Sequence, residues 1–315
     1  MTDTGLATRT LGRTGLAVTR LGYGAMSLDD GRLTPVTPEQ AREVLNALLD
    51  GGINFIDTSP DYGGSEEAIG AYIAHRRSEY FLASKCGCPV AVQPEPGQPP
   101  QHVYTRENII AGVEQSLRRM KTDYLDLVEF HGTPSRGRLE REGSIEALRE
   151  LQQQGKVRFI GASTTLPQLP AVIEMGVFDA FQIPYSALQR DHEAWISTAA
   201  AAHAGTIIRG GVARGGPAPD KGWDTRRLPE VAPEVPRQLW EQAGLDDLLE
   251  GRSRMEFMLR FTLSHPDVHT AIVGTANADH LRANIEAARK GPLHPGIRDE
   301  AIRRLESLAP AGATE

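Results

Sequence analysis

Cysteine is scarce in this sequence, with only Cys86 and Cys88 among 315 residues. Two cysteines cannot build a disulfide framework, and a separation of two positions is poorly suited to a bridge between them. We therefore expect buried thiols and a reducing, cytoplasmic location.

Long apolar runs are also missing. The longest stretches, such as FDAFQIPY, span about eight residues, whereas a membrane-spanning helix needs roughly 20. The first residues contain arginines and no apolar core followed by a small-residue cleavage site, so we expect no secretory signal. The sequence predicts no association with a membrane.

An excess of positive charge is absent as well. The formal net charge is -7, so the chain lacks the excess of lysine and arginine that is typical of a nucleic-acid-binding protein. An anionic ligand would therefore need a local site, built from a few cations and backbone N–H groups. The 40% hydrophobic and 24% charged residues can supply a core and exclude a wholly disordered chain.

Short β-branched or aromatic runs alternate with longer amphipathic segments along the whole chain. This alternation is typical of βα units and a parallel sheet. We expect eight strands, at 19–26, 54–59, 80–86, 124–131, 157–163, 179–185, 205–209 and 268–274. Helices are expected at 38–50, 65–76, 106–121, 144–155, 167–175, 191–203, 252–264 and 278–290. Eight such units predict a (β/α)8 TIM barrel, with residues 1–315 forming a single domain.

Two segments interrupt the alternation, 87–104 and 210–236, and both are rich in proline and glycine. Each follows a strand, so both are predicted to be long loops at the C-terminal face, where barrel enzymes place their active sites. The leading TRTLGRTGLAVT is predicted to form an N-terminal β-hairpin that plugs the opposite end of the barrel.

Four proton-handling residues fall at the C-terminal ends of successive strands: Asp57, Tyr62, Lys85 and His131. Each residue alone has an ordinary structural explanation. Asp57 could cap a turn and Tyr62 could be a packed aromatic. Lys85 could lay its stem along apolar surface, and His131 could be a core histidine. Together on one rim they indicate a catalytic site.

These residues suggest a reduction mechanism. A phenol titrates near about 10, and the ammonium of Lys85 would lower the pKa of Tyr62 so that it can protonate a developing alkoxide. Asp57 would keep Lys85 charged, and His131 would orient the substrate carbonyl. Since no side chain here supplies hydride, the mechanism implies a nicotinamide cofactor.

The segment DTSPDYGGSEEAIG at 57–70 resembles the Asp-Thr-x-x-x-Tyr-Gly-x-Ser-Glu stretch of aldo-keto reductases. The resemblance continues through SKCG, TDYLDLVEFHG, GKVRFIGAS, FQIPYS and IVGTANADHLRANI, from about residue 8 to 290. It implies an NAD(P)H-dependent reductase of aldehydes or ketones, with Tyr62 as proton donor, Lys85 and Asp57 as its tuning pair, and His131 as the orienting residue.

The resemblance also implies cofactor-binding residues. Asp57, Ser163 and Gln182 would face the nicotinamide ribose and carboxamide, and Tyr185 would stack on the ring. Thr164 stands where the family often has asparagine. The glycine-rich loop after the seventh strand would fold over the pyrophosphate and contribute Arg209, Gly211, Val212, Arg214 and Gly215.

At the eighth strand, Thr275 and the following helix start would hold a phosphate, and Asn284 would reach the adenine. Gly274 and His280 stand where many relatives have Lys and Arg around the 2′-phosphate. NADP (NADPH) is the preferred cofactor, because Arg282 lies close by and the family usually uses it, while NAD is possible.

Other interpretations are open at this point. A cofactor-sensing regulatory subunit, resembling potassium-channel β subunits, would bind cofactor and turn over slowly. An aldolase would form a Schiff base on Lys85. The sequence assigns no residue to a metal, and His265 and His269 are expected to be structural. The expected partner is a small aldehyde or ketone, and the chain is expected to be a monomer or a small homo-oligomer. Which aldehyde or ketone is the substrate depends on the rim loops.

Overall fold

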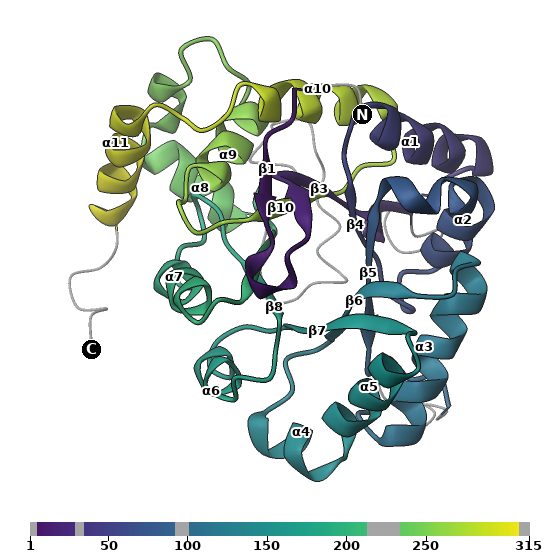
Figure 1. Cartoon of the computed structure of the whole chain (residues 1–315). Coiled ribbons are helices and arrows are strands. Elements are labelled where there is room, and N and C mark those ends of the chain that lie inside the picture. The colour runs from purple at the N-terminus through teal and green to yellow at the C-terminus, as the bar shows by residue number, and fades with distance from the viewer. Residues whose placement is uncertain (1–4, 29–34, 92–100, 213–233, 309–315) are drawn as a thin grey trace.

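The computed structural model describes residues 5–28, 35–91, 101–212 and 234–308. Within these ranges eight parallel strands close into a barrel in the order β10-β3-β4-β5-β6-β7-β8-β9 (Figure 1). The strands are β3 (Leu21–Gly24), β4 (Phe55–Asp57), β5 (Phe81–Cys86), β6 (Leu125–Phe130), β7 (Val157–Ser163), β8 (Ala180–Pro184), β9 (Gly205–Arg209) and β10 (Thr270–Val273). The predicted TIM barrel is confirmed, and every expected strand contains one of these.

Helices surround the barrel, as Figure 1 shows. In the described ranges they are α1 (Pro38–Asp50), α2 (Ser65–Tyr72), α3 (Arg106–Met120), α4 (Arg136–Arg141), α5 (Ser144–Gln153), α6 (Leu169–Glu174), α7 (Glu193–Ala201), α8 (Glu234–Gln242), α9 (Arg254–Leu263), α10 (Ala278–Arg289) and α11 (Pro295–Glu306). The eight expected helix ranges contain α1, α2, α3, α5, α6, α7, α9 and α10, whereas α4, α8 and α11 lie outside those ranges. None of the helices in the described ranges is long and apolar enough to cross a membrane.

Local sequence explains where α1 begins. Thr37 accepts a hydrogen bond from the backbone of Gln40, and the Gln40 side chain accepts one from the backbone of Thr37. With Pro38 at the first helical position, this capping box satisfies backbone donors that the helix itself leaves unpaired. Leu45 and Leu48 on the same helix are fully buried, so α1 packs its apolar face onto the barrel.

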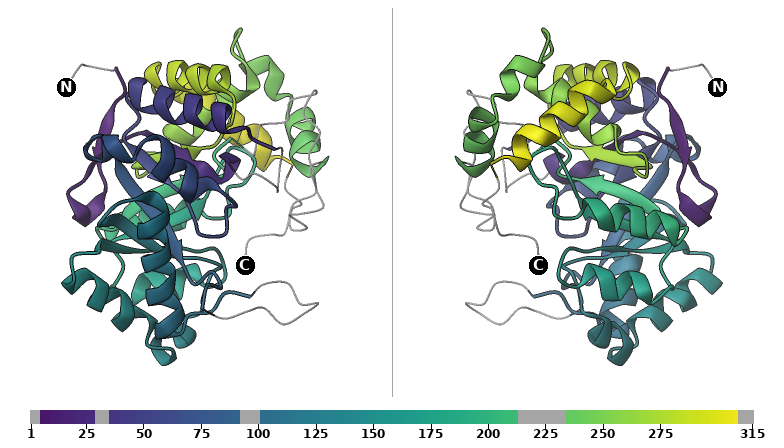
Figure 2. Two further views of the ribbon diagram at one scale, coloured as in Figure 1. Left: turned by 90° about the vertical axis from the view of Figure 1, so that its right-hand side faces the viewer. Right: turned by 90° about the vertical axis from the view of Figure 1, so that its left-hand side faces the viewer.

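The N-terminal hairpin closes one end of the barrel. Strands β1 (Thr8–Thr10) and β2 (Ala17–Thr19) pair antiparallel, and Figure 2 shows the purple hairpin at one end of the molecule. Leu11, Leu16 and Val18 are buried against the interior residues Phe55 and Leu127. The predicted plug is present, and it leaves the opposite end of the barrel for the site.

Alternation along the strands brings polar side chains to that opposite end. Residues two apart on a strand share a face, so each strand carries a column of interior residues. The interior column changes from apolar or small to polar toward the C-terminal end: Phe55 to Asp57, Ala83 to Lys85, Leu127 to Glu129, Gly161 to Ser163, and Ala180 to Gln182. Each of the five polar residues is buried. A layer of buried apolar and small residues therefore lies beneath a polar floor formed by these five side chains.

Candidate functional site

A buried ion pair lies at the centre of the polar floor. The Nζ of Lys85 donates to Asp57 Oδ1 and, at 3.1 Å, to the backbone oxygen of Thr58. Lys85 and Asp57 are 1% and 2% exposed. Burial alone would lower the pKa of Lys85, but Asp57, Tyr62 and Glu129 together raise it above its ordinary value. Lys85 is therefore held as an ammonium ion, which argues against a Schiff-base aldolase, because that chemistry needs the neutral amine.

A second carboxyl group, Glu129, faces the same ammonium. Its Oε2 lies 3.6 Å from Lys85 Nζ, and both side chains are fully buried. Burial raises the pKa of Glu129 to about 8, while the charge of Lys85 opposes that rise. At neutral pH Glu129 is thus mainly protonated, and one ammonium faces one carboxylate, that of Asp57.

Gln182 links the two carboxyl groups. Its Nε2 donates to Asp57 Oδ1 at 2.9 Å and to Glu129 Oε2 at 3.2 Å, and its Oε1 accepts from Ser163 Oγ at 3.1 Å. Strand pairing places Ser163 directly beside Gln182, and Lys85 directly beside Glu129. The barrel register therefore determines this network.

Tyr62 follows β4 and lies above the ion pair. The Nζ of Lys85 is 5.5 Å from the centre of the half-buried Tyr62 ring. The expectation that Lys85 lowers the pKa of Tyr62 overall is wrong for this structure: burial raises that pKa above its ordinary value, and the Lys85 charge only opposes the rise. The phenol accordingly carries its proton at neutral pH, as a proton donor must.

His131 follows β6 on the same rim. Its ring meets that of Tyr62 edge to face at 5.9 Å between centres, and its Nδ1 lies 3.4 Å from Cys88 Sγ. Burial lowers the pKa of His131 to about 3, so the ring is neutral at physiological pH. A neutral imidazole can donate one hydrogen bond to a carbonyl oxygen without adding a charge.

The residues expected to face the nicotinamide separate into two groups. Ser163, Thr164 and Gln182 lie together at the ends of β7 and β8, and no group in the described ranges bonds the buried Thr164 Oγ1. Tyr185 lies elsewhere: it is fully buried, its hydroxyl donates to Glu193 at 3.1 Å, and its ring meets His265 edge to face. The ring therefore has no open face for the expected stacking, because the core encloses it.

The expected pyrophosphate loop is described only up to Val212. Arg209 ends β9 at the rim, Gly211 accepts a hydrogen bond from Thr262 Oγ1 at 2.7 Å, and Val212 is buried in the core. Arg214 and Gly215 lie outside the described residues.

At β10, Gly274 is exposed, and the backbone oxygen of Thr275 accepts from Tyr23 at 2.8 Å. Asn277 caps α10 and already accepts from the backbone N–H groups of Asp279 and His280. The Asn277 side chain therefore already occupies two of the backbone N–H groups that were expected to bind a phosphate.

Two further residues of α10 bear on the expected adenine site. Asn284 lines a cavity of about 240 Å³ between α9 and α10. Arg282, on which the NADP preference depends, pairs with Asp279 at 2.6 Å and with Glu43 at 3.5 Å.

Sequence reasoning missed Glu129 and His102. Glu129 lies two residues before His131 on β6, so period-two alternation places both on the same face of the strand and was the signal that could have found it. His102 carries no such signal, because it lies in a loop whose path brings it to His131 only in three dimensions.

Comparison with known proteins places these features in context. The model of the Aldo/keto reductase family matches residues 20–308. An uncharacterized oxidoreductase, YqkF of Bacillus subtilis, is 29% identical over 95% of both chains. The holo form of an aldo-keto reductase from Bacillus halodurans superposes with a TM-score of 0.80 at 28% identity, covering 95% of this chain and 96% of that one. A glycerol dehydrogenase from Gluconobacter oxydans gives 0.80 at 25% identity, covering 98% and 97%.

Proposed function

Since the chain belongs to the aldo/keto reductase family, we propose that it reduces an aldehyde or ketone with NADPH, Tyr62 protonating the carbonyl oxygen. The chain is an NAD(P)H-dependent oxidoreductase that acts on small carbonyl compounds. One observation supports the assignment of Tyr62 as the proton donor. The protonated Tyr62 lies next to the buried ammonium of Lys85, which the Asp57 carboxylate in the barrel floor keeps charged.

Each residue of the site has a distinct part in this proposal. His131 orients the carbonyl oxygen beside Tyr62 through a ring N–H. As negative charge develops on that oxygen, Tyr62 transfers its proton, and the resulting phenolate is stabilised by the Lys85 ammonium. Asp57 and Gln182 hold Lys85 in position, so the charge is fixed before the reaction begins.

The residues at the rim fit a nicotinamide cofactor, which supplies hydride to the carbonyl carbon when bound. Thr164 offers a buried hydroxyl that no described group bonds, beside the Ser163 and Gln182 side chains, and a carboxamide would bond such groups. The cavity at Asn284 offers space for an adenine at the other end. Tyr185 is not part of this proposal, because its ring is enclosed in the core.

The preference for NADPH rests on Arg282. Its side chain is 58% exposed and pairs with surface carboxylates, contacts of low strength that a phosphate dianion can replace. We expect Arg282→Ala to lower kcat/KM with NADPH and leave kcat/KM with NADH unchanged. Equal efficiencies with the two cofactors in the unaltered protein would show that the preference is wrong.

The proton-donor role is tested by Tyr62→Phe. Loss of a general acid typically costs about 10² to 10⁴ in rate, so turnover of an aldehyde should fall by that factor, while binding of NADPH, followed by fluorescence, stays intact. Tyr72→Phe, at the end of α2, is the matched control and should keep full turnover. Retained turnover in Tyr62→Phe would refute the assignment. Slow turnover with tight NADPH binding in the unaltered protein would instead favour a cofactor sensor.

A further inference from the structure

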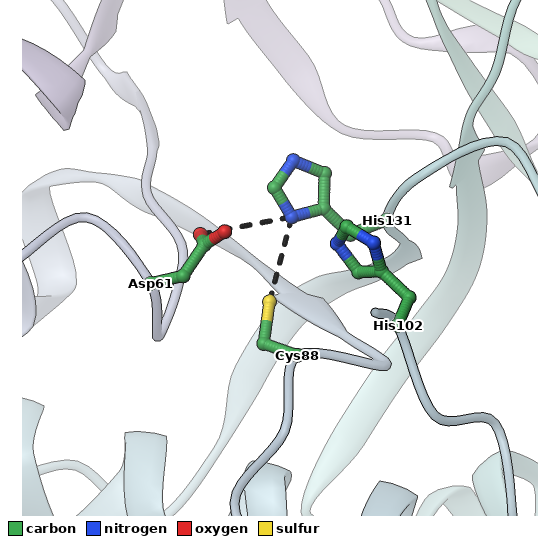
Figure 3. Close-up of side chains that lie close together, drawn as sticks. All are labelled: Asp61, Cys88, His102 and His131. Atoms are coloured by element: carbon green, nitrogen blue, oxygen red, sulfur yellow. Dashed lines mark hydrogen bonds and ion pairs between the residues drawn. The ribbon is translucent and has the colours of Figure 1, made fainter. Parts of the chain in front are cut away.

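Four side chains with metal-binding atoms converge beside the site. Asp61, Cys88, His102 and His131 each offer one ligand atom, and these atoms all lie within 4.8 Å of one another. Figure 3 shows the four side chains pointing toward one another, with Asp61 and Cys88 joined to Nδ1 of His131 by the drawn contacts. We propose that this cluster is a binding site for a zinc-like divalent cation.

The donor set selects the class of cation. Thiolate and imidazole ligands favour Zn²⁺ and similar metals, whereas Ca²⁺ and Mg²⁺ take oxygen ligands. Tetrahedral Zn²⁺ binds sulfur at about 2.3 Å and nitrogen or oxygen at about 2.0 to 2.2 Å, so its ligand atoms are separated by roughly 3.3 to 3.8 Å. The Nδ1 of His131 lies 3.4 Å from Cys88 Sγ and 3.7 Å from Asp61 Oδ1, which already matches that spacing.

Charge also balances in this cluster. When Cys88 Sγ binds the cation, the thiol releases its proton to solvent, and the thiolate and the Asp61 carboxylate together carry two negative charges. These cancel the two positive charges of the cation. A neutral centre can form in a partly buried position without a large desolvation cost.

Hydrogen bonds to the backbone at or beside Cys88, His102 and His131 support three of the four ligands. The buried side chain of Asn108 donates to the backbone oxygen of Cys88 at 2.9 Å and to that of Val103, next to His102, at 2.8 Å. His131 donates its backbone N–H to Cys86 at 3.0 Å, and its backbone oxygen accepts from Tyr104. Such support limits the reorganisation that metal binding requires.

A second observation points to a ligand at His102. Its Nε2 is buried, and no group in the described ranges hydrogen-bonds that atom. The His102 ring lies against Gly132, where any larger residue would collide with it, and its centre is 4.8 Å from that of His131. Buried ring nitrogens normally have a partner, and coordination would supply one.

A hydrogen bond from Ser59 orients the Asp61 carboxylate within the cluster. Ser59 Oγ donates to Asp61 Oδ1 at 2.5 Å, and the same hydroxyl lies 3.4 Å from Cys88 Sγ. Hydrogen bonds of this kind to ligating carboxylates fix their direction around metals. The cluster therefore has four ligands and an outer partner.

The test uses the untagged full-length chain, Co²⁺ as a coloured substitute for Zn²⁺, and a reductant without thiols. We expect one equivalent of Co²⁺ to produce a thiolate-to-cobalt absorption band in the near ultraviolet, and Zn²⁺ to abolish it by displacement. Cys88→Ser should remove the band. It should also weaken binding at least about tenfold, since even outer-sphere partners contribute that much.

Cys86→Ser is the matched control, because Cys86 is equally buried and two positions away but is not part of the cluster. This variant should keep the band. His102→Gln, an exchange in the loop before α3, should keep the band and weaken binding, so the proposal is testable even where Cys88→Ser fails to fold. Absence of a band in the unaltered protein, or its loss in Cys86→Ser with retention in Cys88→Ser, would overturn the proposal. The readout is binding, so it is independent of whether Tyr62 is the proton donor.

Discussion

The protonation state of Glu129 leads to a specific stability prediction. Burial raises the pKa of Glu129 to about 8 in the folded chain, from an ordinary value of about 4.5. Between these values the folded state keeps a proton that the unfolded state has lost. The free energy of unfolding therefore decreases as pH rises through this window, by about 1.4 kcal/mol per pH unit from this group.

Glu129→Gln keeps the shape and removes the titration. The variant should thus lack this part of the pH dependence. From about pH 5.5 to pH 7.5, the stability of the unaltered protein relative to the variant should fall by about 3 kcal/mol, with no further relative change well above pH 8. Gly161, which lies beside Glu129 and leaves room for its side chain, is unchanged in this experiment.

Urea unfolding of both proteins at several pH values measures this difference directly. Glu146→Gln, an exchange at an exposed position of α5, controls for the removal of a surface charge. Parallel curves for the unaltered protein and Glu129→Gln across the window would refute the reasoning, since Glu129 would then be ionised in the folded chain throughout. A relative stability that rises with pH would refute it as well.

Two packing predictions complete the set. Gly70→Ala should lower the free energy of unfolding by roughly 1 to 3 kcal/mol, because the added methyl group would overlap the backbone oxygen of Arg119 on α3. Gly112→Ala is the control: its new methyl group meets only a Val90 methyl at 3.9 Å, so this variant should be neutral or stabilising. Leu11→Ala should cost roughly 2 to 5 kcal/mol by opening a cavity in the hairpin plug, and a loss under about 0.5 kcal/mol in thermal or urea unfolding would contradict that role.

The sequence predicts the barrel because its evidence is local. Period-two apolar runs, caps such as Thr37 and glycine-rich breaks each depend on neighbouring residues, and together they specify eight βα units. Strand ends then identify Asp57, Lys85 and His131, since the fold brings consecutive strand ends to one rim.

The remaining features depend on three-dimensional neighbours. The pKa of Tyr62 is determined by how much of the ring is enclosed as well as by Lys85, so charge reasoning alone gives the wrong sign. Tyr185 follows a strand on the expected rim, but its ring turns into the core toward Glu193. The meeting of Cys88 with His102 and His131 results from loop paths, for which short sequence patterns contain no signal.

The polar floor also has a consequence for how the chain reaches its native state. The hydrogen bond from Gln182 to Asp57 joins residues 125 positions apart, so it cannot form until β4 and β8 are both in the closing barrel. An emerging chain that ends before β8 contains Asp57, Lys85 and Glu129 without the amide that links the two carboxyl groups. The polar floor is therefore completed only by contacts between distant parts of the chain, and a chain that ends before β8 should lack the linked network of Asp57, Glu129 and Gln182.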